Sequence, residues 1–198
     1  LYELLKKAGG DKHSVDDYVF HRNERNYYNF LLVEQDNGHF GKTIAKIFLY
    51  STYQKILYTH LSKSISDDIK AIALKSIKEV DYHFKHSRAW LLRLGGGTEE
   101  SKVKIQDSID ELWRFTGEMF ESDDVEKNLT SENLITASNT YYHEWSKTVK
   151  VTLEEASLTE PENVVMLSGG KKGLHTEKLG FMLAEMQYLP RTYPNAKW

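Results

Sequence analysis

The sequence predicts an all-α fold, namely an antiparallel bundle of long helices in a single domain over residues 1–198. Only 3 Pro occur, so long helices can run without interruption. Between residues 69 and 94, apolar or small side chains recur at alternating intervals of four and three residues, the spacing of a seam between packed antiparallel helices. A chain of this length can bury such a core as one domain.

The predicted helices cover residues 40–62, 67–94, 98–120, 130–153 and 171–189. Ser66, Thr98 and Thr130 precede three of them, because hydroxyl side chains cap helix N-termini. Glycines at 95–97 are predicted to stop the second helix, and Pro190 to end the last. The resulting pattern contains no long non-helical segment between residues 40 and 153.

The remaining segments are predicted with less regular structure. Leu1–Ala8, followed by two glycines, is typical of the last turns of a helix; the chain lacks an initiator Met, and we expect the first part of this helix to be missing. Ser14 is an N-cap candidate. Segment 26–35 fits either a strand or a buried loop. The acidic residues 121–124 are expected to form a solvated turn.

Composition excludes several classes of function. The 26 Lys+Arg and 29 Asp+Glu give a net charge of −3, which argues against a nucleic-acid-binding protein. Cysteine is absent, so disulfides, thiolate metal sites and cysteine nucleophiles are impossible. No apolar run is long enough to cross a bilayer. We therefore expect a cytoplasmic protein that binds neither nucleic acid nor membrane.

The segment 77–86 contains potential metal ligands on one helix face. Glu79 and His83 are four residues apart, and His83 and His86 are three apart, so their side chains can be neighbours. A di-iron helix bundle uses a Glu-x-x-His pair. The residue three positions before His83 is Val80, which cannot act as a ligand. This helix therefore lacks the bridging carboxylate.

Two other predicted helices lack ligands as well. Residues 40–62 include no Asp or Glu, and Glu177 in the last helix is followed three residues later by Gly180 rather than His. Iron needs anionic oxygen ligands to balance its charge. We therefore expect a bundle without metal, cofactor or catalytic residues of its own.

Two alternatives remain open for the residues around His83. In the structural interpretation, Glu79 and His86 flank the seam in ion pairs or hydrogen bonds, and His83 is satisfied in the core. In the catalytic interpretation, the chain is a self-contained di-iron or manganese carboxylate oxidase that uses Glu79, His83, His86 and Glu177.

The stretch 168–175 is a glycine-rich turn that contains Lys171 and Lys172, placed by the prediction at the start of the last helix. Backbone amides at such a position attract phosphate, although the stretch does not match the phosphate-loop pattern. Two cations at a helix start interact unfavourably with the helix dipole, and a nearby anion would offset this cost. The lysines are therefore candidates for binding a partner carboxylate or the phosphates of coenzyme A, and a purely solvated turn is the alternative.

A family resemblance is carried by several stretches that follow one another along the whole chain: Asn23–Arg25 with Asn29–Gln35, Ile77–His83, Arg93–Thr98, Leu112–Thr116 and Gly169–Leu189. The last of these is the most specific. Together they resemble the ferritin-like PaaC-type subunits of the bacterial phenylacetyl-CoA 1,2-epoxidase. This resemblance implies a ferritin-like helix bundle, from which the first N-terminal helix and part of the helix ending at Leu5 are absent here.

The resemblance also implies a function. In that multicomponent monooxygenase, a paralogous PaaA-type subunit holds the di-iron centre and epoxidises phenylacetyl-CoA with O₂, and a flavin and iron–sulfur reductase supplies electrons from NADPH. The PaaC-type subunit is the catalytically silent paralogue that binds and stabilises the catalytic one. Val80 then replaces the ligand carboxylate, and His83 is a vestigial ligand position. A homodimer or a hetero-oligomer with the other subunits is expected.

Overall fold

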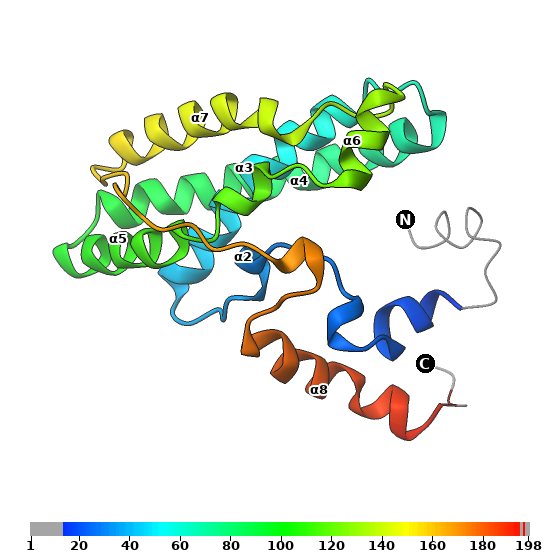
Figure 1. The fold of residues 1–198 in the computed structure, drawn as a ribbon. Coiled ribbons are helices and arrows are strands. Elements are labelled where there is room, and N and C mark those ends of the chain that lie inside the picture. The colour runs from blue at the N-terminus through cyan, green and yellow to red at the C-terminus, as the bar shows by residue number, and fades with distance from the viewer. Residues whose placement is uncertain (1–13, 195, 197–198) are drawn as a thin grey trace. The chain divides into compact units, whose positions relative to one another are not determined.

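Every regular element in the described part of the chain, residues 14–194 and 196 of the computed structural model, is a helix (Figure 1). The prediction of an all-α, ferritin-like helical fold is confirmed. The chain divides into two compact units: residues 36–168 form the bundle unit, and residues 1–35 with 169–198 form the terminal unit. The single-domain organisation stays a prediction.

Two long antiparallel helices form the centre of the bundle unit. α3 (Phe40–Leu61) and α4 (Asp67–Gly95) have the predicted bounds to within one residue and pack along each other. Ser66 caps α4, since its hydroxyl accepts a hydrogen bond from the Ile69 amide. The seam predicted for α4 is buried at Ala73, Val80, Ser87 and Leu91.

Two further helices cover this pair. α5 (Glu99–Trp113) packs on α3 and α4, and so does α7 (Tyr142–Glu155). The Trp145 indole of α7 donates to the Leu49 carbonyl oxygen of α3 over 3.0 Å. The Lys42 ammonium of α3 donates to Glu111 of α5 over 2.8 Å. The core of this unit is thus fixed by both apolar packing and cross-helix hydrogen bonds.

One helix prediction in the bundle unit is too long, and one helix was not predicted. The helix expected over 98–120 ends at Trp113 and is followed by a separate 3₁₀ turn, Gly117–Phe120. Residues 121–123 form a non-helical link, as expected for the acidic stretch. The unpredicted helix α6 (Asp124–Ser131) follows it, because the Asp123 carboxylate accepts from the Glu126 amide and caps the helix.

The helix expected over 130–153 begins later than predicted. Thr130 and Ser131 end α6 instead of capping the next helix, and Asn133, with φ 56°, takes the chain out of it. A 3₁₀ turn, Ser138–Tyr141, then precedes α7. The sequence does not distinguish the two possibilities, because hydroxyl and acidic side chains occur both where a helix begins and in the turn where a helix ends.

The N-terminal part of the terminal unit is irregular. Ser14 acts as the predicted cap, because its hydroxyl accepts from the Asp17 amide. The short elements that follow are a π-helix, Asp17–His21, a 3₁₀ turn, Glu24–Asn26, and α2, Leu31–Glu34. Residues 27–30, between the last two elements, are extended and pair with no strand in the described chain, so the strand alternative for segment 26–35 is wrong. The loop alternative holds only for residues 27–30, because residues 31–34 form α2. The predicted helix end at Leu1–Ala8 lies outside the described residues.

The C-terminal helix differs from its predicted bounds of 171–189. Residues Gly170–Lys172 form a 3₁₀ turn, and α8 extends over Glu177–Thr192. Gly173 has a left-handed backbone with φ 74°, which separates the turn from the helix. Pro190 lies inside the last turn of α8, near an end at which the loss of one backbone hydrogen bond is tolerated.

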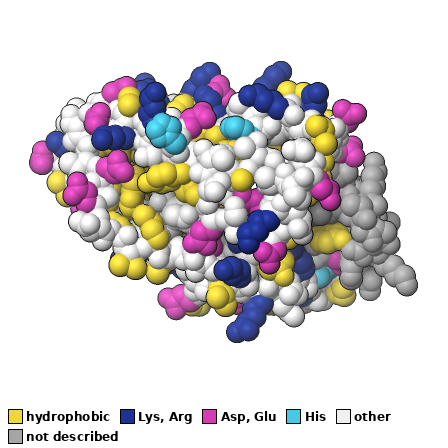
Figure 2. Space-filling view, turned by 45° about the horizontal axis from the view of Figure 1, so that its top comes forward, with side chains coloured by type: hydrophobic (Ala, Val, Ile, Leu, Met, Phe, Trp, Pro, Cys, Tyr) yellow, Lys and Arg dark blue, Asp and Glu magenta, His cyan; other side chains and the backbone are white. Residues whose placement is uncertain are grey.

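The surface is mixed in charge. On the face shown in Figure 2, basic and acidic side chains are interspersed, with scattered apolar groups between them. This distribution agrees with the small net charge of −3 and differs from the basic face of a nucleic-acid-binding protein. None of the described helices is long and apolar enough to span a membrane.

Candidate functional site

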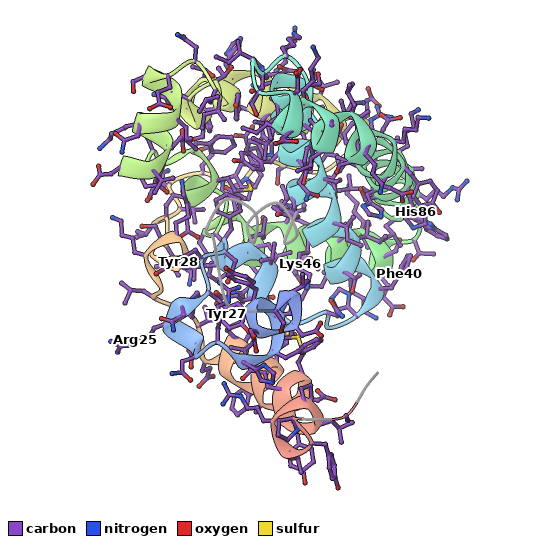
Figure 3. The ribbon with its side chains drawn as sticks, turned by 90° about the vertical axis from the view of Figure 1, so that its right-hand side faces the viewer. Arg25, Tyr27, Tyr28, Phe40, Lys46 and His86 are labelled. Carbon is purple, nitrogen blue, oxygen red and sulfur yellow. The ribbon has the colours of Figure 1, made fainter. Side chains whose placement is uncertain are left out.

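Most of the predicted ligand positions on α4 are exposed. Glu79, His83 and His86 all lie at the surface of the chain, and only Val80 is buried, at 6% exposure. Figure 3 shows His86 on the outer side of α4. The expectation that His83 is satisfied in the core is therefore wrong. The physical reason is its position in the helical repeat: Val80 and Ser87 share the face toward α3, and His83 does not.

The exposed rings of His83 and His86 both contact the exposed Tyr82 ring. The Tyr82 ring stacks on His86 with centroids 5.8 Å apart, and its edge meets the His83 ring at 6.0 Å. Nearby, Asp81 forms ion pairs with Lys55 over 2.8 Å and Lys85 over 2.6 Å. Hydrogen bonds from these two lysines hold the pKa of Asp81 below its usual value, so this carboxylate is fully used in structural pairing.

The interior between α3 and α4 at the level of Val80 is apolar. One turn after Val80, the Phe84 ring stacks on Phe48 of α3, with centroids 6.2 Å apart. Next to them, the hydroxyls of Ser51 and Ser87 lie 3.5 Å apart, and Ser87 donates to the His83 carbonyl oxygen over 2.7 Å. At the edge of this cluster, the Lys55 ammonium lies over the Phe84 ring, 4.5 Å from its centroid.

These residues do not fit the di-iron centre that the fold family implies. Such a centre requires inward-facing carboxylates and imidazoles from several helices. Val80 offers a methyl-covered surface, and the ring pair fills the space beside it. In the described part of the chain, no three His, Asp or Glu side chains gather closely enough to hold a metal ion.

The glycine-rich turn is explained by close backbone packing. A Cβ atom at Gly170 would overlap the Asn29 carbonyl oxygen, and one at Gly173 would overlap that of Arg25. Both glycines are therefore required for the turn to approach the segment that precedes α2, where Figure 3 labels Arg25 and Tyr27.

The predicted position of the two lysines is wrong. Lys171 and Lys172 belong to the 3₁₀ turn, and α8 begins only at Glu177, so neither cation opposes the dipole of α8. Lys172 is exposed and Lys171 is half-buried. The helix-start argument for a bound anion therefore no longer holds, while the exposed charge of Lys172 remains.

A buried acid–imidazole pair follows directly after this turn. His175 Nδ1 lies 2.6 Å from Glu34 Oε1, and both side chains are completely shielded from solvent. The other ring nitrogen, Nε2, lies 2.9 Å from the Tyr27 carbonyl oxygen. Glu34 Oε2 also accepts from the Thr176 amide and hydroxyl, both over 2.8 Å. Every partner of the carboxylate other than the imidazole is a donor, and both nitrogens of the imidazole have a hydrogen-bond partner.

The buried pair belongs to a larger polar network within the terminal unit. Asn29 donates to Glu34 over 2.9 Å. Gln187 of α8 donates to the Tyr27 hydroxyl and to the Arg22 carbonyl oxygen, each over 2.9 Å. This network connects residues 22–34 to residues 175–187 around the two solvent-shielded side chains.

Sequence reasoning missed this network because nothing local marks a buried pair whose members are 141 positions apart. The available signal was indirect. Glu34 and His175 lie in two of the stretches that carry the family resemblance, and a charged residue inside an apolar stretch such as 30–35 is a candidate for a buried partner.

Comparisons with known proteins agree with this structure. A family model described as "Phenylacetic acid catabolic protein" matches residues 1–198. The chain is also similar to a protein of Escherichia coli (strain K12) that is named as the C subunit of 1,2-phenylacetyl-CoA epoxidase, with 44% identity over 183 residues, which are 92% of this chain and 74% of that protein. The resemblance found in the sequence is thereby confirmed: this chain belongs to the phenylacetic acid catabolic protein family.

Proposed function

We propose that this chain is a non-catalytic structural subunit of a multicomponent di-iron monooxygenase that epoxidises phenylacetyl-CoA during aerobic phenylacetate degradation in the cytoplasm. Its role is to bind and stabilise the catalytic paralogous subunit. The observation that carries the proposal is the packing between α3 and α4, where Val80 is buried and the Phe48 and Phe84 rings stack on each other. Family membership supports the pathway, and the name of the E. coli relative supports a role as a subunit.

An iron-binding measurement tests the non-catalytic part. The isolated chain, reconstituted with ferrous iron under air and freed of excess metal, is expected to retain no stoichiometric iron by elemental analysis. His83→Ala is expected to leave that result unchanged, since His83 is exposed and its ring contacts Tyr82. Two iron ions per chain, lost in the variant, would favour the oxidase alternative based on Glu79, His83, His86 and Glu177.

A reconstitution experiment tests the partner. The catalytic subunit encoded with this chain is expected to co-purify with it, to gain thermal stability and to lose activity when the chain is omitted. If the chain instead forms only homo-oligomers, and the catalytic subunit is stable and fully active alone, the proposed role is wrong.

As a lesser part of the proposal, Lys171 and Lys172 supply positive charge to a partner contact or to the phosphates of coenzyme A. The exposed position of Lys172 supports this role. The double charge reversal Lys171→Glu, Lys172→Glu is expected to weaken complex formation or CoA-ester binding, whereas Lys147→Glu, an exposed control on α7, is not. Unchanged complex formation and CoA-ester affinity in the double variant would remove this contribution.

A further inference from the structure

One face of α8 carries large apolar side chains that are exposed in the described part of the chain. Leu179, Leu183 and Gln187 form its buried face. Beside that face, four large side chains are between 36% and 58% exposed and follow one another at intervals of four, three and four residues: Met182, Met186, Leu189 and Tyr193. Met182, Met186 and Leu189 have the spacing of a helix seam and extend over about 10 Å of α8. Tyr193 continues the seam at the C-cap position.

Three of these side chains, those of Met186, Leu189 and Tyr193, border a groove within the terminal unit. The groove has a volume of about 800 Å³ and is lined by residues 14–21 on one side and by the second half of α8 on the other. Phe20, Met186 and Leu189 contribute to its apolar surface. We call this feature the α8 groove.

The charges that line the α8 groove are mainly negative. Asp16, Asp17 and Glu185 border it. Asp17 accepts a hydrogen bond from the Ser14 amide, the largest influence that lowers its pKa to about 2, so it stays ionised at neutral pH. Among the described residues, neither Asp16 nor Glu185 forms an ion pair, and both are exposed.

The nearby arginines do not neutralise these carboxylates. Arg22 donates to the carbonyl oxygens of Tyr18 and Asn26, with its guanidinium over the Tyr27 ring. Arg191 donates to the Arg22 carbonyl oxygen over 3.1 Å. Only His21 adds a basic group to the described lining, and it is bonded to Asp17.

We propose that the α8 groove binds an amphipathic helix of the partner subunit, one whose apolar stripe is flanked by Lys or Arg. The inference rests on the proposed function for the identity of the partner and names the surface that the partner uses. The seam spacing selects a helix, because an extended chain would match a period of two residues. The acidic border selects a cationic flank. Two of the four seam residues are methionines, whose flexible side chains adapt to a partner's apolar surface.

A photo-cross-linking experiment tests the occupant directly. A benzophenone amino acid replaces Met186 in the full chain, and the complex with the catalytic subunit is irradiated and mapped by mass spectrometry. The expected product joins position 186 to a Lys- or Arg-flanked helix of the catalytic subunit. Cross-links to residues 1–13 of the same chain, to a second copy, or to no protein would overturn the proposal. The same group at Val151, exposed on α7, is the position control.

A binding measurement separates the chemistry of the groove from the identity of its partner. The probe is a fluorescent helical peptide of leucine and lysine, and its counterpart replaces every lysine with glutamate. The full chain is expected to bind the lysine peptide at least tenfold more tightly than the glutamate peptide. The double variant Asp16→Lys, Glu185→Lys is expected to lose at least tenfold in affinity for the lysine peptide.

The control variant is Glu144→Lys, Glu154→Lys, which makes the same charge change at exposed positions of α7, and circular dichroism verifies that both variants are folded. Equal peptide affinities for the groove variant and the control would overturn the proposal. The two hypotheses fail separately: if the unmodified chain forms a complex that the groove variant leaves unchanged, only the groove assignment is wrong. If the unmodified chain forms no complex, the proposed function is wrong.

Discussion

At the scale of single residues, the buried Glu34–His175 pair is the most demanding feature of the chain. Taking two charges out of water is costly, and the cost is offset only when geometry and additional hydrogen bonds are favourable. Here Thr176 and Asn29 supply those bonds to the carboxylate, and the Tyr27 carbonyl oxygen accepts from the ring. The buried pair is therefore stable only when all of these hydrogen bonds are present.

Removing one partner of this pair is expected to destabilise the protein strongly. His175→Gln removes the imidazole that faces the buried Glu34 carboxyl group, and breaking such a buried acid–base pair costs about 3–5 kcal/mol in unfolding free energy. The measurement is equilibrium denaturation in urea, compared with His143→Gln on the surface of α7, which is expected to change stability by less than about 0.5 kcal/mol. A similar small change in both variants would show that the pair adds little.

Val80 illustrates how one residue changes the chemistry of a helix bundle. A carboxylate at this buried position would need a cation or several donors, whereas a valine needs only neighbours to pack against. The adjacent Phe84–Phe48 stack and the Ser51–Ser87 contact meet that simpler requirement. This agrees with the proposed structural role.

At the scale of elements, backbone packing explains the glycines of the turn at 168–175, which were first considered for phosphate binding. Gly170 and Gly173 allow the turn to lie against the backbone at Asn29 and Arg25. That approach places His175, two residues later, next to Glu34. The turn therefore positions the buried network.

Two glycine substitutions in the terminal unit are expected to have opposite effects. Gly170→Ala forces a Cβ against the Asn29 carbonyl oxygen and should destabilise by about 1–3 kcal/mol, the cost of overpacking. Gly180→Ala on α8 has its nearest atom, a Glu24 oxygen, at 3.4 Å and should stabilise by about 0.5–1 kcal/mol through helix propensity. Thermal unfolding followed by circular dichroism measures both; a destabilised Gly180→Ala together with a neutral Gly170→Ala would contradict this account.

At the scale of the whole molecule, several tyrosines of the bundle unit ionise late. Burial, the main cause, raises the pKa of Tyr50 to about 12 and, with the further influence of Glu126, that of Tyr141 to about 12. Burial also raises the pKa of Tyr53, with Tyr141 as a second cause. The ordinary value, which applies to the unfolded chain, is 10.0.

These shifts predict a loss of stability in alkaline solution. The folded-state pKa values lie above the unfolded ones, so the contribution to stability is complete below pH 10 and is lost as the pH rises from 10 toward 12. Urea denaturation at a series of pH values should show unfolding free energy falling over this window. Tyr53→Phe should reduce the slope, and Tyr188→Phe, at an exposed position of α8, should not. A pH-independent free energy between pH 10 and 12 would contradict the prediction.

The sequence predicted the central part of the fold well. The bounds of α3 and α4 follow from local signals: the seam spacing, the Ser66 cap and the glycine stop. Where such signals compete, the prediction was wrong. The acidic stretch was predicted only as a turn, and α6, which Asp123 caps directly after it, was missed. α8 begins six residues after Lys171 because Gly173 adopts a left-handed backbone.

For the candidate sites, too, the sequence was sufficient for some properties and not for others. That Val80 cannot be a ligand is a property of the residue and was evident from the sequence, as was the family resemblance that the comparisons confirm. The sequence placed Glu79, His83 and His86 on one face of a helix, but it did not specify which face of α4 meets α3. That choice decides that His83 lies at the surface.

The sequence by itself determined the helical class, the main helices and the family, because periodicity, caps and side-chain chemistry act over a few residues. Only the tertiary structure decided that Glu34 meets His175, that the glycines serve backbone contact, and that α8 presents an apolar seam beside three carboxylates. These features join segments more than a hundred residues apart, and burial and proximity over such distances arise only when the chain has packed.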